Sequence, residues 1–81
     1  MPQVNALGTT GEFTQSAKKF GLDADEIAKS ARHWFEGQVK APVTTYYSFK
    51  AVFDGKQVSF KAALKYDAKK YHLTCMKIER A

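Results

Sequence analysis

The dipeptide Asp54-Gly55 constrains the fold of this chain more than any other feature of its sequence. It separates two runs that are rich in aromatic and β-branched residues, 44–53 and 57–66. Such runs suit a pleated, half-buried surface. Asp-Gly favours a type I′ turn, because both central residues of that turn need positive φ. The dipeptide therefore predicts a two-residue β-hairpin.

A third run extends the hairpin and separates the two faces of the sheet. Counting back from the two-residue turn places Phe49 opposite Phe60, with apolar residues at every second position on that face. The run 70–79 follows a second turn, and we expect Tyr66 to pair with Tyr71. This arrangement predicts a three-stranded antiparallel meander with one apolar face.

Two segments upstream predict helices. The first spans 9–20, with Thr9 in a capping box and Gly21 ending the helix in a left-handed conformation. The second spans 24–36, begins after the N-cap residue Asp23 and carries an apolar stripe along one side. The apolar stripe and the apolar sheet face are natural partners.

The expected fold class is therefore α+β. Two N-terminal helices pack on one face of the three-stranded antiparallel meander, in the order α-α-β-β-β. Residues 1–8 carry no periodic signal and are expected to form a flexible N-terminal arm. Residues 9–81 are expected to form a single domain, as the length of 81 residues suggests.

The net charge of +5 lies in the second half of the chain. Residues 1–40 hold five basic and five acidic side chains, whereas residues 41–81 hold eight basic and three acidic ones. A one-sided positive field favours a polyanionic partner, which is nucleic acid, an acidic protein surface or anionic lipid. The alternative is that the lysines only keep the sheet in solution.

The outer face of the predicted sheet is the main candidate site. We expect lysines to contact phosphates there and flat rings to stack on bases. The face lacks arginine, the usual reader of guanine, so binding should be led by the backbone and weakly sequence-specific. We expect no acidic residue among these side chains, since Glu79 has inward parity. The predicted binding residues are Tyr46, Lys50, Lys61, Lys65, Lys70 and His72.

A second basic patch lies on the helices, and the residues 16–32 around it fit the spacing of a helix-turn-helix. The first turn of the second helix is acidic, through Asp25 and Glu26, which opposes contact with phosphates. A plain helical hairpin is the alternative interpretation. The patch consists of Lys18, Lys19, Lys29 and Arg32.

The competing function is a protein-interaction module, such as a stoichiometric inhibitor or adaptor, which would use the same sheet face or an edge strand. The runs 44–53 and 70–79 are the predicted sheet edges, and an exposed edge accepts a further strand. Such pairing would give a homodimer or a complex with a partner protein.

Catalysis has little support in the sequence. His33 and His72 lie on different elements, and no glycine loop, ligand spacing or carboxylate pair indicates an enzyme, a metal or a cofactor. Cys75 is the single cysteine, so an intrachain disulfide is excluded. We interpret this residue as a small side chain of the core. With no apolar run of spanning length and no signal peptide, we expect a cytoplasmic protein that is not membrane-bound.

Overall fold

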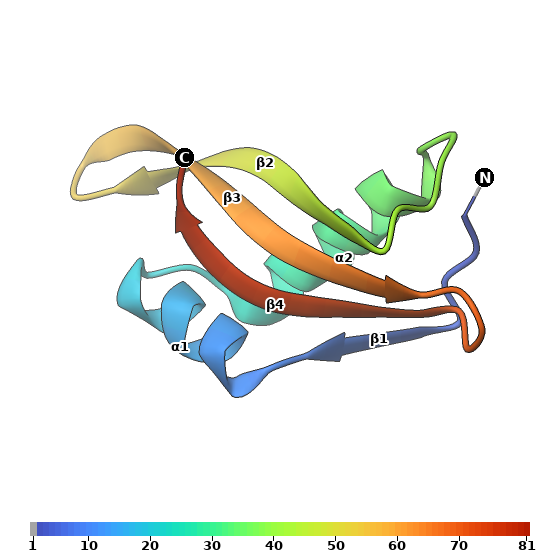
Figure 1. Ribbon diagram of the computed structural model, residues 1–81. Coiled ribbons are helices and arrows are strands. Elements are labelled where there is room, and N and C mark those ends of the chain that lie inside the picture. Colours follow the sequence, from blue (N-terminus) through green and yellow to red (C-terminus); the bar gives the residue numbers. More distant parts are fainter. Residues whose placement is uncertain (1) are drawn as a thin grey trace.

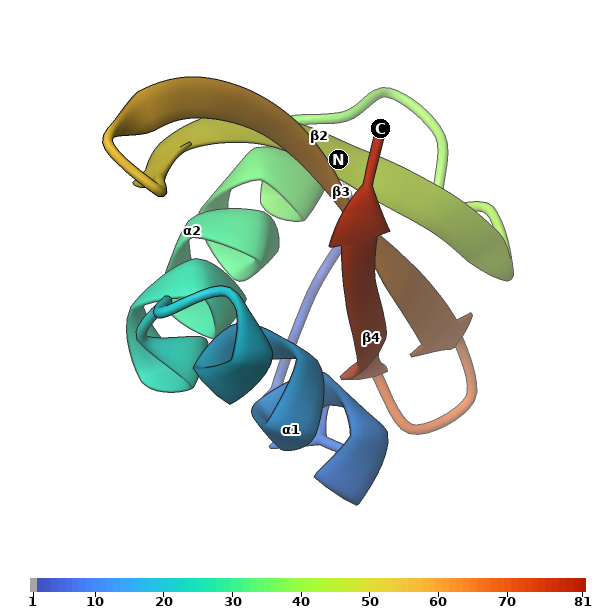
Figure 2. The ribbon, with the colours of Figure 1, turned by 90° about the vertical axis from the view of Figure 1, so that its left-hand side faces the viewer.

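The computed structural model describes residues 2–81 as a four-stranded mixed sheet with two helices on one side (Figures 1 and 2). The sheet order is β1-β4-β3-β2, with β1 parallel to β4 and the other pairs antiparallel. In chain order the elements are β1 (Ala6–Thr9), α1 (Gly11–Lys19), α2 (Ala24–Glu36), β2 (Thr44–Phe53), β3 (Lys56–Asp67) and β4 (His72–Arg80).

The predicted three-stranded meander with N-terminal helices is wrong, because the chain enters the sheet before its first helix. β1 pairs with β4 from Ala6 opposite His72 to Thr9 opposite Cys75. The segment Ala-Leu-Gly-Thr contains only one β-branched residue, so it shows little strand propensity of its own. It is a strand because β4 supplies its hydrogen bonds. β4 is therefore a central strand and not a sheet edge.

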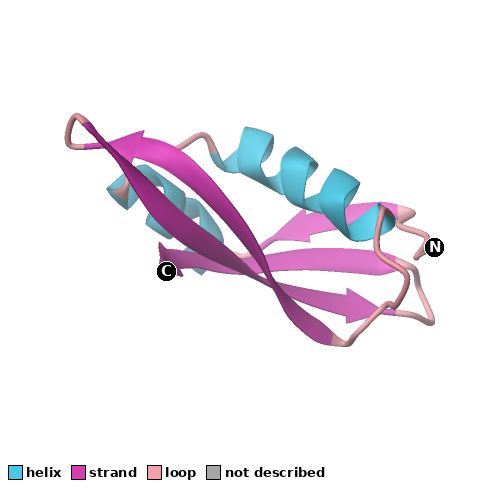
Figure 3. Ribbon diagram, turned by 90° about the horizontal axis from the view of Figure 1, so that it is seen from above, coloured by secondary structure: helices cyan, strands magenta, loops and turns pink. Residues whose placement is uncertain are grey.

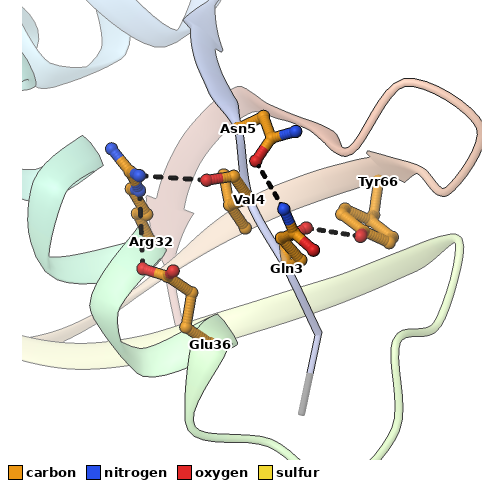
Figure 4. Close-up of polar contacts among 6 residues, drawn as sticks. All are labelled: Gln3, Val4, Asn5, Arg32, Glu36 and Tyr66. Carbon is orange, nitrogen blue, oxygen red and sulfur yellow. Dashed lines mark hydrogen bonds and ion pairs between the residues drawn. The ribbon is translucent and has the colours of Figure 1, made fainter.

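The residues before β1 are attached to the rest of the fold (Figure 4). The Val4 side chain is 3% exposed, and the Val4 carbonyl accepts a hydrogen bond from Arg32 Nη2 at 2.9 Å. The Tyr66 hydroxyl donates a hydrogen bond to the Gln3 carbonyl. Residues 3–8, which are expected from the sequence to belong to a flexible arm over residues 1–8, thus contact other elements of the fold, and Met1 lies outside the described residues.

The β2–β3 hairpin confirms the prediction from Asp54-Gly55. Both turn residues have positive φ, 54° for Asp54 and 74° for Gly55. Phe49 lies opposite Phe60, as the two-residue turn requires. The hairpin is long and coiled, and its tip curls over the helical side of the molecule (Figures 2 and 3).

The helices begin and end close to the predicted residues. α2 is capped by Asp23, whose carboxylate accepts hydrogen bonds from the amides of Asp25 and Glu26. Gly21 has φ of +69° after α1, where the Leu22 amide bonds the Ala17 carbonyl at 2.7 Å, as in a Schellman motif. The N-cap of α1 is Thr10 and not the predicted Thr9.

The core lies between the helices and the inner face of the sheet. Leu7, Phe20, Leu22, Ile27 and Trp34 pack around it and remain partly exposed. Its largest fully buried side chains come from both layers, and they are Phe13, Phe35, Phe60, Leu64, Leu73 and Cys75.

A bulge in β4 changes the pairing that the sequence predicts between the second and third strands of the meander, which are β3 and β4. Leu64 pairs with Cys75, whereas Ala63 pairs with Lys77, so Met76 has no partner on β3. Before the bulge the register differs by two residues from the prediction, since Tyr66 pairs with Leu73 and not with Tyr71. The turn has the predicted four residues, but it spans 68–71 instead of 67–70 and ends in a positive φ at Tyr71.

The bulge reverses the facing of every residue after it, because side chains alternate along a strand. Ile78 is therefore 3% exposed and belongs to the core, although simple alternation from Leu73 places it on the outer face. Lys77 and Glu79 turn outward for the same reason.

Candidate functional site

The face of the sheet that no helix covers is the candidate site, called the outer face below (Figure 2). Small and polar residues such as Ser48, Ser59, Ala63 and Thr74 lie between its charged side chains. Such a surface is open and carries few bulky apolar groups. It can therefore admit an extended ligand without rearrangement of the strands.

Four lysines cross this face as successive diagonal neighbours. Lys50 lies opposite Ser59, two residues before Lys61 on β3. Lys77 lies opposite Ala63, which is two residues from Lys61 and two from Lys65. The Cα atoms of diagonal neighbours in a sheet are about 7–8 Å apart. We call Lys50, Lys61, Lys77 and Lys65 the lysine diagonal.

Tyr46 is the aromatic residue next to this diagonal. Its side chain is 51% exposed, and Lys61 Nζ lies 4.9 Å from the centroid of its ring. A cation at that distance is attracted by the π-electrons of the ring. The contact orients both side chains on the open surface.

Two carboxylates moderate the positive charge, which corrects the expectation that the face has no acidic residue. Glu79 lies directly opposite Lys61, because the β4 bulge gives it outward parity. Asp67 lies opposite His72 at the end of the β3–β4 pair. Among residues 2–81, the ion pair of Arg32 with Glu36 at 3.4 Å is the only one within 4.0 Å, so Glu79 makes no direct bridge to Lys61.

Two of the predicted site residues stand apart from the diagonal. Lys70 lies in the turn over 68–71 and not on a strand, so it is at the end of the sheet. His72 is on the outer face, and its Nε2 lies 2.7 Å from the position that a Cβ on Gly8 would take. The imidazole therefore covers Gly8 and is less available for stacking than the prediction assumed.

The structure separates the predicted helix patch into free and engaged residues. Arg32 bonds the Val4 carbonyl and pairs with Glu36, so it is part of the fold (Figure 4). Lys18 and Lys19 are exposed in the last turn of α1, and Lys29 is exposed on α2. The patch does not form one continuous surface with the lysine diagonal, because it lies on the helical side.

Lys77 is the site residue that the sequence interpretation missed. Strict alternation from Leu73 and Cys75 places it inward. The available signal was the spacing of the apolar residues, because Leu73, Cys75 and Ile78 break the period of two between the second and third. Such a break indicates a bulge and an outward turn of the next lysine.

The described residues offer few groups for other chemistry. Within residues 2–81 no cluster of three His, Cys, Asp or Glu side chains is placed to hold a metal ion. Burial raises the pKa of the Cys75 thiol from 9.0 to about 11, so at neutral pH this side chain is an unreactive thiol. No helix in the described part of the chain is long and apolar enough to cross a membrane.

Comparison of the chain with protein-family models, with curated proteins and with solved structures finds no match.

Proposed function

We propose that this protein binds nucleic acid through the outer face of its sheet, by contacts to the phosphate backbone with weak sequence specificity. The observation that carries the proposal is the lysine diagonal on the face without helices. Successive lysines of the diagonal have Cα atoms about 7–8 Å apart, so their long side chains can contact successive phosphates of one strand. No arginine or amide side chain at the centre of the face is placed to read base edges.

Tyr46 favours single-stranded over duplex nucleic acid in this proposal. Its ring is half exposed beside Lys61, and unpaired bases stack on aromatic side chains regardless of sequence. Bases inside a duplex are not available for that contact. Loss of the ring should therefore weaken binding to single strands more than binding to duplexes.

The proposal predicts a steep dependence on salt. Four phosphate contacts give a slope of about −3 in log affinity against log salt for single strands. Raising the salt from 50 to 200 mM should then weaken binding roughly 50-fold. Fluorescence anisotropy with labelled single-stranded DNA, single-stranded RNA and duplex DNA measures both the affinity and the slope.

Charge-neutral variants locate the site. The double variant Lys61→Gln plus Lys77→Gln removes two contacts and should reduce the slope by about 1.4 on single strands. The double variant Lys18→Gln plus Lys29→Gln lowers the net charge equally but leaves the outer face intact, so it should bind almost as the parent does. Circular dichroism establishes that each variant is folded. Lys50→Gln plus Lys65→Gln, at two exposed positions, repeats the test independently.

Two outcomes would contradict the proposal. One is the absence of binding to any of the three probes at 50 mM salt. The other is an equal loss of affinity in the two double variants, which would mean that overall charge and not the outer face is responsible.

A further inference from the structure

β2 presents a long edge with unpaired backbone groups. It is the last strand in the order β1-β4-β3-β2, and among residues 2–81 no strand lies on its other side. The two-residue turn makes Phe53 and Lys56 a hydrogen-bonded pair, so the odd-numbered residues of β2 bond to β3. The bond from the Tyr66 amide to the Val43 carbonyl, at 2.8 Å, continues this pattern. The amides and carbonyls of the even-numbered residues therefore point away from the sheet.

The usual protections of an edge strand are missing from β2. Proteins blunt such edges with proline, bulges, several charges or a very short strand. β2 has ten residues in unbroken register with β3, contains no proline and carries one charge, Lys50. The opposite edge, β1, has only four residues. The contrast identifies β2 as the edge that is free to pair.

The inner side of this edge is aromatic and only partly covered. Tyr47 and Phe49 are partly buried, with ring centroids 5.4 Å apart, and Trp34 of α2 lies 5.5 Å from Tyr47. Hollows of about 330 and 520 Å³ lie beside Trp34. An added strand would cover these rings as well as the backbone edge.

We propose that β2 pairs antiparallel with β2 of a second copy of this chain, about a twofold axis at Ser48. The free groups of even-numbered residues then meet those of the partner. Tyr46 lies opposite Lys50 of the partner subunit, and Tyr47 lies opposite Phe49 of the partner subunit. Residues 44–52 all find a partner, and the join makes one continuous eight-stranded sheet. This proposal does not depend on nucleic-acid binding.

Charge complementarity favours a second copy of this chain as the partner of β2, and it favours the register with the twofold axis at Ser48. The only charged side chain of β2 faces an aromatic ring, which attracts a cation. The two copies of Lys50 are separated by four residues along the strand, or about 14 Å. A twofold axis at Phe49 would bring the two lysines to about 7–8 Å, and one at Lys50 would place them face to face. An axis at Tyr47 would pair only residues 44–50, and one at Tyr46 only residues 44–48, so both leave more of β2 unpaired than an axis at Ser48 does.

A cysteine at the twofold axis tests the register. Ser48→Cys would place two thiols on a hydrogen-bonded pair with Cα atoms about 5.5 Å apart, which is within the range for a disulfide. We expect mild oxidation to give a covalent dimer on a non-reducing gel. The matched control is Ser59→Cys, because Ser59 is also exposed on the outer face but lies on β3, away from the edge. Ser59→Cys should run as a monomer on the same non-reducing gel, because its thiols are too far apart to form a disulfide. The native Cys75 is buried and takes no part in the cross-link.

A proline at the same position tests the pairing without a cross-link. The Ser48 amide bonds nothing on β3, so Ser48→Pro should keep the fold, as proline does on the free side of an edge strand. It removes the amide that the partner needs. Light scattering should show the unmodified chain moving from monomer to dimer mass with rising concentration, and Ser48→Pro remaining monomeric.

Three results would overturn the proposal. The unmodified chain could stay monomeric up to millimolar concentration, which would leave the edge to a strand of a different protein. Ser59→Cys could cross-link as well as Ser48→Cys. A folded Ser48→Pro variant could retain the dimer mass, which would place the interface elsewhere.

Discussion

Thr10 is the residue at which the two layers of the fold are joined. Its hydroxyl accepts a hydrogen bond from the Phe13 amide at 3.1 Å and donates one to the Met76 carbonyl at 2.6 Å. Its own amide donates to the Cys75 carbonyl at 3.1 Å. One side chain thus caps α1 and bonds the bulge residue of β4. The facing of Lys77 and Glu79 depends on that bulge.

Thr10→Val should lower the free energy of unfolding by about 1–2 kcal/mol, the usual cost of a lost N-cap. Valine keeps the shape of the side chain but removes both hydroxyl bonds. Urea unfolding followed by circular dichroism measures the change. Thr9→Val is the control, because Thr9 is exposed and is the N-cap that the sequence alone suggests. A larger loss in Thr9→Val than in Thr10→Val would refute the assignment of the cap.

At the scale of elements, β1 and the residues before it decide the shape of the sheet. β1 turns β4 from an edge into a central strand. The connection of Arg32 to the Val4 carbonyl ties this segment to α2, and the Tyr66 hydroxyl ties it to β3. A short segment is thus held by three elements that lie far from it in the sequence.

Val4→Ala should cost about 2 kcal/mol of stability, since it removes two buried methyl groups and leaves a cavity. A loose arm would predict no change. Thermal and urea unfolding report the difference. Val39→Ala is the matched control, because the Val39 side chain is 93% exposed and should change stability by less than about 0.5 kcal/mol. Equal stability of Val4→Ala and the parent would mean that the segment is not packed in solution.

At the scale of the whole molecule, the two proposed binding surfaces of the sheet point in different directions. The outer face presents the lysine diagonal perpendicular to the sheet, whereas the edge of β2 presents backbone groups within its plane. The two surfaces share Tyr46 and Lys50, while Lys61, Lys65 and Lys77 lie on inner strands. A dimer through β2 would therefore leave most of the diagonal exposed.

Amide hydrogen exchange should reveal the free edge residue by residue. In dilute solution the amides of Tyr47 and Phe49 should be protected by β3, whereas those of Tyr46, Ser48 and Lys50 should exchange quickly. At high concentration the second group should become protected if β2 pairs with itself. NMR exchange measurements at two concentrations test this pattern. Protection of the even-numbered amides in dilute solution would show that the assigned hydrogen-bonding direction of β2 is wrong.

The sequence by itself determined the features that depend on neighbouring residues. Asp54-Gly55 set the hairpin register, because few dipeptides accept two positive φ values in succession. Asp23 and Gly21 set the ends of the helices through local hydrogen bonds. The outward placement of Lys50, Lys61 and Lys65 followed from the period of two in strands without bulges.

Only the tertiary structure decided the features that depend on distant partners. β1 is a strand because β4 lies beside it, and the sequence of β1 carries no local signal for that pairing. The bulge at Met76 bonds Thr10, which is 66 residues away in the chain, and it moves Lys77 and Glu79 onto the outer face. Hydrogen bonds between segments so far apart form only when the chain has folded. The spacing of Leu73, Cys75 and Ile78 is a local sign of the bulge, but it does not show which distant residue bonds it.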